Sequence, residues 1–130
     1  MDENTKFVVD ASFVLAFLLP DEATSVIEKY FDAYKARKIN FISSVLLPFE
    51  VLNGLKTGLL RRRNSPEKIE ELAGKFIKLN IQIEENDYLG TLKTALSYNL
   101  TFYDAAYLHL AQVQDLPLLT LDKQLKKVSR

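Results

Sequence analysis

The sequence contains no cysteine among its 130 residues. This absence excludes disulfide bonds, thiolate nucleophiles and zinc sites built from cysteine. Histidine is almost as scarce: His109 stands alone, inside a predicted helix and without a partner motif, so we assign it a structural role. We therefore expect no catalytic or metal-binding role for cysteine or histidine.

The sequence also lacks an excess of either charge and a long hydrophobic run. Lysine plus arginine and aspartate plus glutamate both number 17, so a polyanionic partner must be met by a local basic patch. The apolar run 13–19 stops at Pro20 and is too short to cross a bilayer. The first residues, MDENTK, carry acids where a signal peptide carries basic residues. We therefore expect a cytoplasmic protein without a membrane segment.

What the sequence does contain is the composition of one globular domain, with 48% hydrophobic and 26% charged residues. No linker, repeat or low-complexity segment divides it, so we predict a single domain over residues 1–130. Short apolar runs alternate with segments of helical periodicity, which indicates an α/β/α domain around a central parallel sheet. The predicted strands are 6–10, 39–43, 81–85 and 116–121.

The predicted helices start at residues that commonly cap helices. Residues 11–19, before the first of them, are predicted as a turn and a short apolar segment. The helices are expected at 21–37, from Ser43 or Ser44 to about Leu60, from Ser65 onward, from Asn86 to about Tyr98, from Thr101 to about Gln114, and after Asp122.

Four acidic residues fall where the carboxyl ends of the strands are expected. Asp10 ends the first strand, Glu50 lies in the helix after the second, Asp104 begins the helix before the last strand, and Asp122 follows that strand. Ligands of open parallel sheets bind at this edge. Carboxylates packed together repel each other unless a cation joins them, and hard oxygen ligands suit Mg²⁺ or Mn²⁺. The pattern predicts a divalent-metal site.

Each acid also has a purely structural interpretation. Asp10 could cap a turn, Asp122 could be an ordinary helix N-cap, and Asp104 could sit favourably in a helix first turn. Glu50 could be a solvated helix residue, although its neighbours are mostly apolar.

Four segments resemble, in order, the motifs of the PIN-domain ribonucleases, specifically VapC-like toxins of toxin–antitoxin modules. They are VVDASFVLAFLLPDE with Asp10, FEVLNGL with Glu50, LTFYDAAYLHLA with Asp104, and LLTLDKQL with Asp122. The resemblance implies a PIN fold, a metal-dependent endoribonuclease in which these acids are catalytic and bind the metal, frequent homodimers, and inhibition by a cognate antitoxin protein. Ser12, Ser44 and Thr120 match polar positions that support the acids in the family.

The chain departs from the family at its last helix, because no residues for a further strand follow "KKVSR". We therefore expect a sheet of four or five strands, with residues 118–121 as an exposed edge. A homodimer built from helix faces would cover remaining apolar surface. The candidate faces carry Leu46, Leu59 and Leu60, and Leu89, Leu92 and Leu96.

The run Arg61-Arg62-Arg63 is either a solvated helix end or a set of RNA phosphate contacts. Two other functions compete with the nuclease. A phosphoryl-accepting domain is disfavoured, because a phosphatase motif needs a second aspartate where this chain has Ser12. A non-catalytic PIN-like protein-interaction module is the main alternative to a nuclease.

Overall fold

The computed structural model describes residues 5–129, which form a four-stranded parallel sheet in the order β3-β2-β1-β4. The strands are β1 (Thr5–Val9), β2 (Ile39–Ser44), β3 (Gln82–Glu84) and β4 (Leu118–Leu119). β1 and β2 are the central pair, and β4 joins β1 through only two residues. The predicted parallel sheet is confirmed, with four strands in the described part of the chain.

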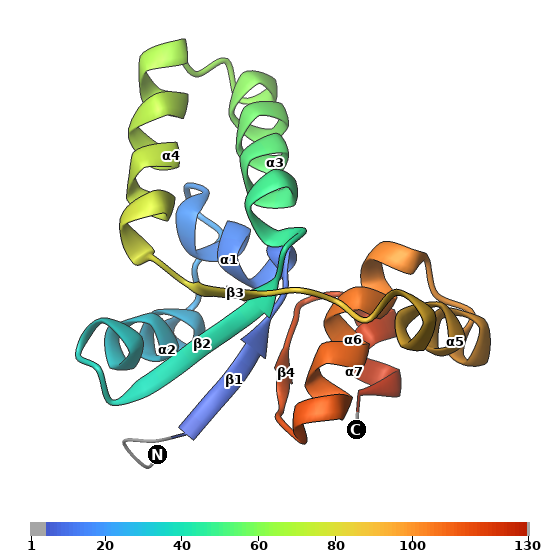
Figure 1. The fold of residues 1–130 in the computed structure, drawn as a ribbon. Helices are drawn as coiled ribbons and strands as arrows, with labels where there is room; N and C mark the ends of the chain where they lie inside the picture. Colours follow the sequence, from blue (N-terminus) through green and yellow to red (C-terminus); the bar gives the residue numbers. More distant parts are fainter. Residues whose placement is uncertain (1–4, 130) are drawn as a thin grey trace.

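Helices cover both faces of the sheet, so the expected α/β/α architecture is confirmed. Figure 1 shows α1, α2 and α4 on one side and α5, α6 and α7 on the other, while α3 and α4 form a hairpin that extends away from the sheet. None of the helices within residues 5–129 is long and apolar enough to cross a membrane. Their bounds are α1 Ala11–Leu18, α2 Ser25–Lys35, α3 Leu47–Arg61, α4 Pro66–Leu79, α5 Tyr88–Tyr98, α6 Phe102–Gln114 and α7 Lys123–Val128.

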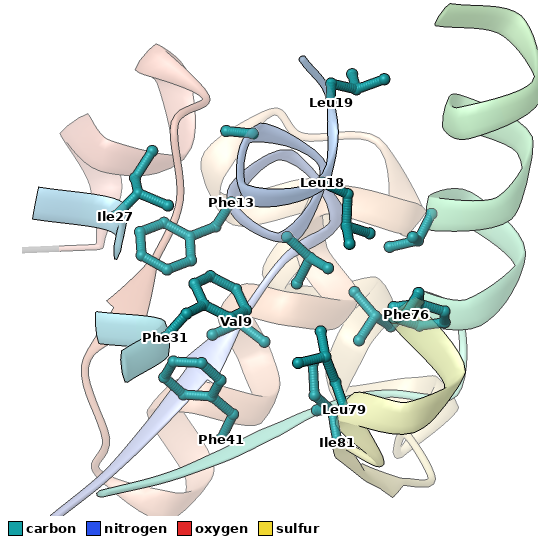
Figure 2. Close-up of a cluster of buried hydrophobic side chains, with 14 of the residues drawn as sticks. Val9, Phe13, Leu18, Leu19, Ile27, Phe31, Phe41, Phe76, Leu79 and Ile81 are labelled. Atoms are coloured by element: carbon teal, nitrogen blue, oxygen red, sulfur yellow. The ribbon is translucent and has the colours of Figure 1, made fainter. Parts of the chain in front are cut away.

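The main core lies between the sheet and α1, α2 and α4. Figure 2 shows Phe13, Phe31 and Phe41 on one side of this cluster and Phe76 and Leu79 on the other. A smaller cluster lies between α6 and the other face of the sheet. It contains the strand residues that point toward this face, including Val8 and Ile42. Both faces of β1 and β2 are therefore buried, as in parallel sheets generally.

The structure corrects several predicted elements. Residues 11–18 form α1 rather than a turn and an apolar segment, because Asp10 caps a helix that is apolar on nearly every side. α5 starts after Asp87 rather than after Asn86. The side chain of Asn86 donates a hydrogen bond to the carbonyl oxygen of Ala106 in α6 instead of capping α5. β3 and β4 are shorter than predicted, since their outer residues leave the hydrogen-bonded ladder.

β4 lies at an edge of the sheet, as expected, but residues 118–121 are only partly exposed. Leu118 and Leu119 are half-buried, and Thr120 is buried against Asp10. The side chain of Leu125 in α7 is completely buried in a cluster with α5 and α6 residues, and Val128 packs against the same cluster. The chain after the last strand thus folds onto the α5–α6 layer, while β4 remains an edge strand of the sheet and Leu121 is 40% exposed.

Candidate active site

Asp10 lies between the end of β1 and the start of α1, and it is the most buried of the four acids. Its carboxylate accepts hydrogen bonds from the backbone N–H of Phe13 at 3.0 Å, the hydroxyl of Ser12 at 2.7 Å and the hydroxyl of Thr120. Burial raises the pKa of Asp10, while these three donors oppose that rise. The carboxylate is held in one orientation by residues from the ends of two neighbouring strands.

Asp104 and Asp122 both lie at helix N-termini. The hydroxyl of Thr101 accepts the backbone N–H of Asp104 at 3.0 Å, so Thr101 is the cap of α6 and the Asp104 carboxylate lies one turn inside. Asp122 is itself the N-cap of α7 and accepts the backbone N–H of Leu125 at 2.9 Å. Its capping interpretation is therefore correct, and it leaves the second carboxylate oxygen for another partner.

Glu50 lies half-buried in the first turn of α3 and accepts a hydrogen bond from the hydroxyl of Tyr107. Tyr107 is buried in α6, three residues after Asp104 and therefore on the same helix face. Burial, then the hydrogen bond to Glu50, and then the negative charge of Glu50 raise the pKa of Tyr107 far above its ordinary value. Tyr107 is thus a permanent donor that orients Glu50. From its spacing in the sequence, this tyrosine is expected only to be a core residue.

Ser44 does not contact an acid, contrary to the role implied by the resemblance. Its hydroxyl donates to the side-chain oxygen of Asn86 at 2.6 Å and accepts the backbone N–H of Leu46 at 3.1 Å. Asn86 in turn donates to the carbonyl oxygen of Ala106 at 2.9 Å. This chain of bonds ties the end of β2 to the first turns of α6, which carry Asp104.

The four acids share one edge of the sheet, and their charges act on one another. The pKa of Asp104 is raised first by burial and then by the negative charges of Asp122 and Glu50, while the charge of Asp104 helps to raise the pKa of Asp10. Asp104 is therefore central to the group. Ser12 and Thr120 support Asp10, and the hydroxyls of these two residues lie 3.3 Å apart.

The donor set fits a hard divalent cation. Every candidate ligand is a carboxylate, and a cation would relieve the repulsion that raises the pKa of Asp104. Among residues 5–129, no three acidic or histidine side chains stand close enough together to hold one ion by themselves. Mg²⁺ is usually bound through one or two carboxylates and keeps waters and substrate phosphates as its other ligands, so it does not need a group of three.

The three arginines lie at the end of α3, at the tip of the α3–α4 hairpin and away from the sheet (Figure 1). Arg62 is engaged within the protein, since its guanidinium binds Glu22 at 2.5 Å and the carbonyl oxygen of Gly58 at 3.0 Å. Arg61 and Arg62 line a groove of about 500 Å³. Asn53 and Thr57, on the helix that begins near Glu50, line it too.

Known proteins share this sequence and fold. The PIN domain family matches residues 7–130. The chain is 34% identical to Ribonuclease VapC3 of Pyrobaculum aerophilum over 124 residues, which cover 92% of each protein. The crystal structure of PAE2754 from Pyrobaculum aerophilum has a TM-score of 0.73 at 24% identity and covers 93% of this chain and 77% of that one. The structure of Mycobacterium tuberculosis VapC20, described as a Sarcin-Ricin loop cleaving toxin, has a TM-score of 0.62 at 13% identity and covers 93% of both. The chain belongs to the PIN domain family, as a homologue of a VapC ribonuclease.

Proposed function

We propose that this protein is a divalent-metal-dependent endoribonuclease that hydrolyses RNA phosphodiester bonds, and that it is the toxin of a toxin–antitoxin pair. The observation that carries the proposal is the grouping of four acids around Asp104, where burial and mutual repulsion raise the pKa of two of them. Unpaired carboxylates destabilise a fold, so their grouping is typical of a functional site. The similarity to a curated VapC ribonuclease supports the same activity.

In the proposed mechanism, one or two carboxylates of the group Asp10, Glu50, Asp104 and Asp122 would bind Mg²⁺ or Mn²⁺ directly, and the others would bind it through water. Such an ion activates water and stabilises the charge that develops on a phosphodiester during in-line displacement. Ser12, Thr120 and the Phe13 N–H fix the direction of the Asp10 carboxylate. Tyr107 fixes Glu50, which is half-exposed and can accept a proton from the attacking water.

The proposed partners are RNA, an antitoxin protein and a second copy of this chain. The homodimer is supported by exposed apolar side chains on α5, where Leu89, Leu92 and Leu96 all face outward. The other predicted face is weaker, because Leu59 is completely buried and Leu46 is half-buried, while Leu60 is exposed. An RNA substrate and an antitoxin both imply a cytoplasmic location.

Arg61 and Arg63, at the opposite end of α3 from Glu50, remain candidate RNA-binding residues. We expect Arg61→Ala with Arg63→Ala to lower the salt dependence of RNA binding by about 0.7 for each phosphate that the variant no longer neutralises. Arg62→Ala is expected to change stability more than RNA binding, because Arg62 already pairs with Glu22. An unchanged salt dependence in the double variant would show that these arginines are a solvated helix end and do not contact RNA phosphates.

An RNA cleavage assay tests the proposal. Purified protein is incubated with structured and single-stranded RNA in Mg²⁺, in Mn²⁺ and in excess EDTA, and the Asp104→Asn variant is compared with Asp115→Asn. Asp115 lies at the opposite end of α6, where asparagine tolerates the same left-handed backbone. We expect metal-dependent cleavage by wild type and Asp115→Asn, and none by Asp104→Asn. Absence of cleavage in every condition would favour the non-catalytic interaction module.

A further inference from the structure

A second charged feature of the molecule plays no part in the proposed chemistry. The ends of α2 and α4 border a cleft of about 870 Å³ at the start of β2. We call it the basic cleft. Its charged lining residues are all cations, and two amides accompany them: Lys35, Arg37, Lys75, Lys78, Asn40 and Asn80.

The cations of the basic cleft have no acidic partners within residues 5–129. The ion pairs of this region involve Arg62 with Glu22 and Lys68 with Glu71, and none involves a cleft residue. The ammonium groups of Lys35 and Lys75 lie 4.7 Å and 4.8 Å from the centre of the Phe17 ring. Because Phe31 stacks on this ring at 4.0 Å, the two ammonium groups approach the face that Phe31 leaves open. Two like charges are thus held together, and an anion would relieve their repulsion.

The backbone at Arg37 adds a second observation. Arg37 has a φ of 61°, in the left-handed region, at the end of α2. The corresponding residues after α4, α5 and α6 are Asn80, Asn99 and Asp115, whereas the corresponding residue after α3 is again an arginine, Arg63, with a φ of 59°. The left-handed residue at the end of α2 thus places a cation in the lining of the basic cleft.

We propose that the basic cleft binds phosphate groups of the RNA substrate at a distance from the bond that is cut. This inference rests on the proposed ribonuclease function. The cations come from two separate helices, so they suit successive phosphates better than a single small anion. Asn40 lies near the start of β2, and Ser44 lies at its acidic end, about 13 Å further along the strand. An RNA that reaches both sites must span several nucleotides.

Binding is measured in an Asp104→Asn background, which prevents cleavage, using a single-stranded RNA of about 16 nucleotides. We expect Lys75→Ala with Lys78→Ala to weaken binding about tenfold and to lower the salt slope by about 1.4, which corresponds to two phosphates. The matched control is Lys29→Ala with Lys93→Ala, which removes two exposed lysines outside the cleft. Arg37→Asn is expected to weaken binding while its melting temperature stays equal or rises.

Equal loss of binding in the control, or none in the cleft variant, would overturn the inference. A cleft variant that no longer binds polyglutamate but binds RNA as wild type does would also overturn the inference. The basic cleft would then bind an acidic protein instead of RNA. With Asp104 intact, cleavage of an RNA of about 4 nucleotides should be the same in the cleft variant and wild type. A wild type that binds RNA through the cleft but never cuts it would contradict the proposed function and leave this inference standing.

Discussion

Asp104 shows how one residue satisfies local and long-range requirements together. Its position in the first turn of α6 favours a negative charge, because the free N–H groups of the helix face it. The charges of Asp122 and Glu50 oppose ionisation, and so does burial, which raises the pKa of Asp104. The capping and functional interpretations of Asp104 are compatible, since Thr101 supplies the cap.

Replacement of Asp104 by asparagine separates its contribution to RNA cleavage from its contribution to stability. We expect Asp104→Asn to lower RNA cleavage at least about 100-fold, while the free energy of unfolding at neutral pH stays equal or rises. The stability follows because the variant removes a charge that its neighbours repel. Urea unfolding and a cleavage assay on the same preparation measure both effects. A variant that unfolds easily yet cleaves at the wild-type rate would show that Asp104 is structural.

The raised pKa values predict how stability depends on pH. Asp10 and Asp104 hold their protons more tightly in the folded state than in the unfolded chain. The folded state therefore binds more protons from about pH 4 up to the raised pKa values, so these two groups make stability fall as pH rises through that window. Urea unfolding between about pH 4 and pH 7 should show that the free energy of unfolding falls less steeply with pH in Asp104→Asn than in wild type. An equal fall of the free energy of unfolding in both proteins would show that Asp104 does not contribute to the pH dependence of stability.

Tyr107 offers a test of how Glu50 is positioned. Tyr107→Phe removes the hydroxyl that donates to Glu50 but keeps the buried ring. We expect a loss of about 1 kcal/mol in stability, because one hydrogen bond to a half-solvated carboxylate is removed. Cleavage should fall about tenfold, with a changed pH profile, because Glu50 is no longer oriented. An unchanged pH profile would mean that Tyr107 contributes to packing alone.

The sequence predicted the acids better than it predicted their supporting residues. The positions of Asp10 and Asp122 follow from the strands that precede them, because residues after parallel strands meet at one edge. The hydrogen bonds of Tyr107 and Ser44 depend on how α6 packs across β2, which periodicity does not reveal. Tyr107 could have been noticed only by its spacing of three residues from Asp104. The catalytic roles of the acids stay predictions.

At the scale of elements, helix α1 shows why a buried helix escapes prediction from periodicity. Seven of the eight residues in Ala11–Leu18 are apolar, so no polar face marks the helical repeat. α2 and α4, by contrast, have one apolar face each, and their sequence patterns indicate both helices, although α2 spans Ser25–Lys35 rather than 21–37. The class of fold followed from such patterned elements and from the apolar strands. The short ladders of β3 and β4 depend on pairing partners, which local sequence does not specify.

Two glycines on neighbouring helices test the packing of α1 against α3. A methyl group on Gly54 would lie 2.5 Å from a methyl carbon of Leu15 in α1, whereas a methyl group on Gly74 in α4 would meet nothing within 4 Å. We expect Gly74→Ala to stabilise the protein by about 0.5–1 kcal/mol through helix propensity. Gly54→Ala should gain less or destabilise, because Leu15 must shift. Thermal unfolding of both variants decides, and equal gains would mean that the helices do not need this close approach.

At the scale of the whole molecule, exposed apolar side chains are concentrated on α5. Leu89 and Leu96 are 62% and 76% exposed, and Tyr88 beside them is 79% exposed. We expect wild type to sediment as a dimer at micromolar concentration and Leu89→Glu with Leu96→Glu to sediment as a monomer, because buried carboxylates would oppose association. Ile77→Glu, on α4, is the control because Ile77 is similarly exposed. A monomeric wild type, or dissociation in the control as well, would contradict this interface.

The hydroxyl of Thr120 on Asp10 joins the two ends of the domain, and this has a consequence for the time when the chain is synthesised. Asp10 emerges early from the ribosome, whereas Thr120 and Asp122 are added 110 and 112 residues later, on the order of ten seconds at ordinary rates of translation. Until then the buried carboxylate lacks its partner strand and the fourth acid is missing. The proposed nuclease site is therefore incomplete until nearly the whole chain has been synthesised.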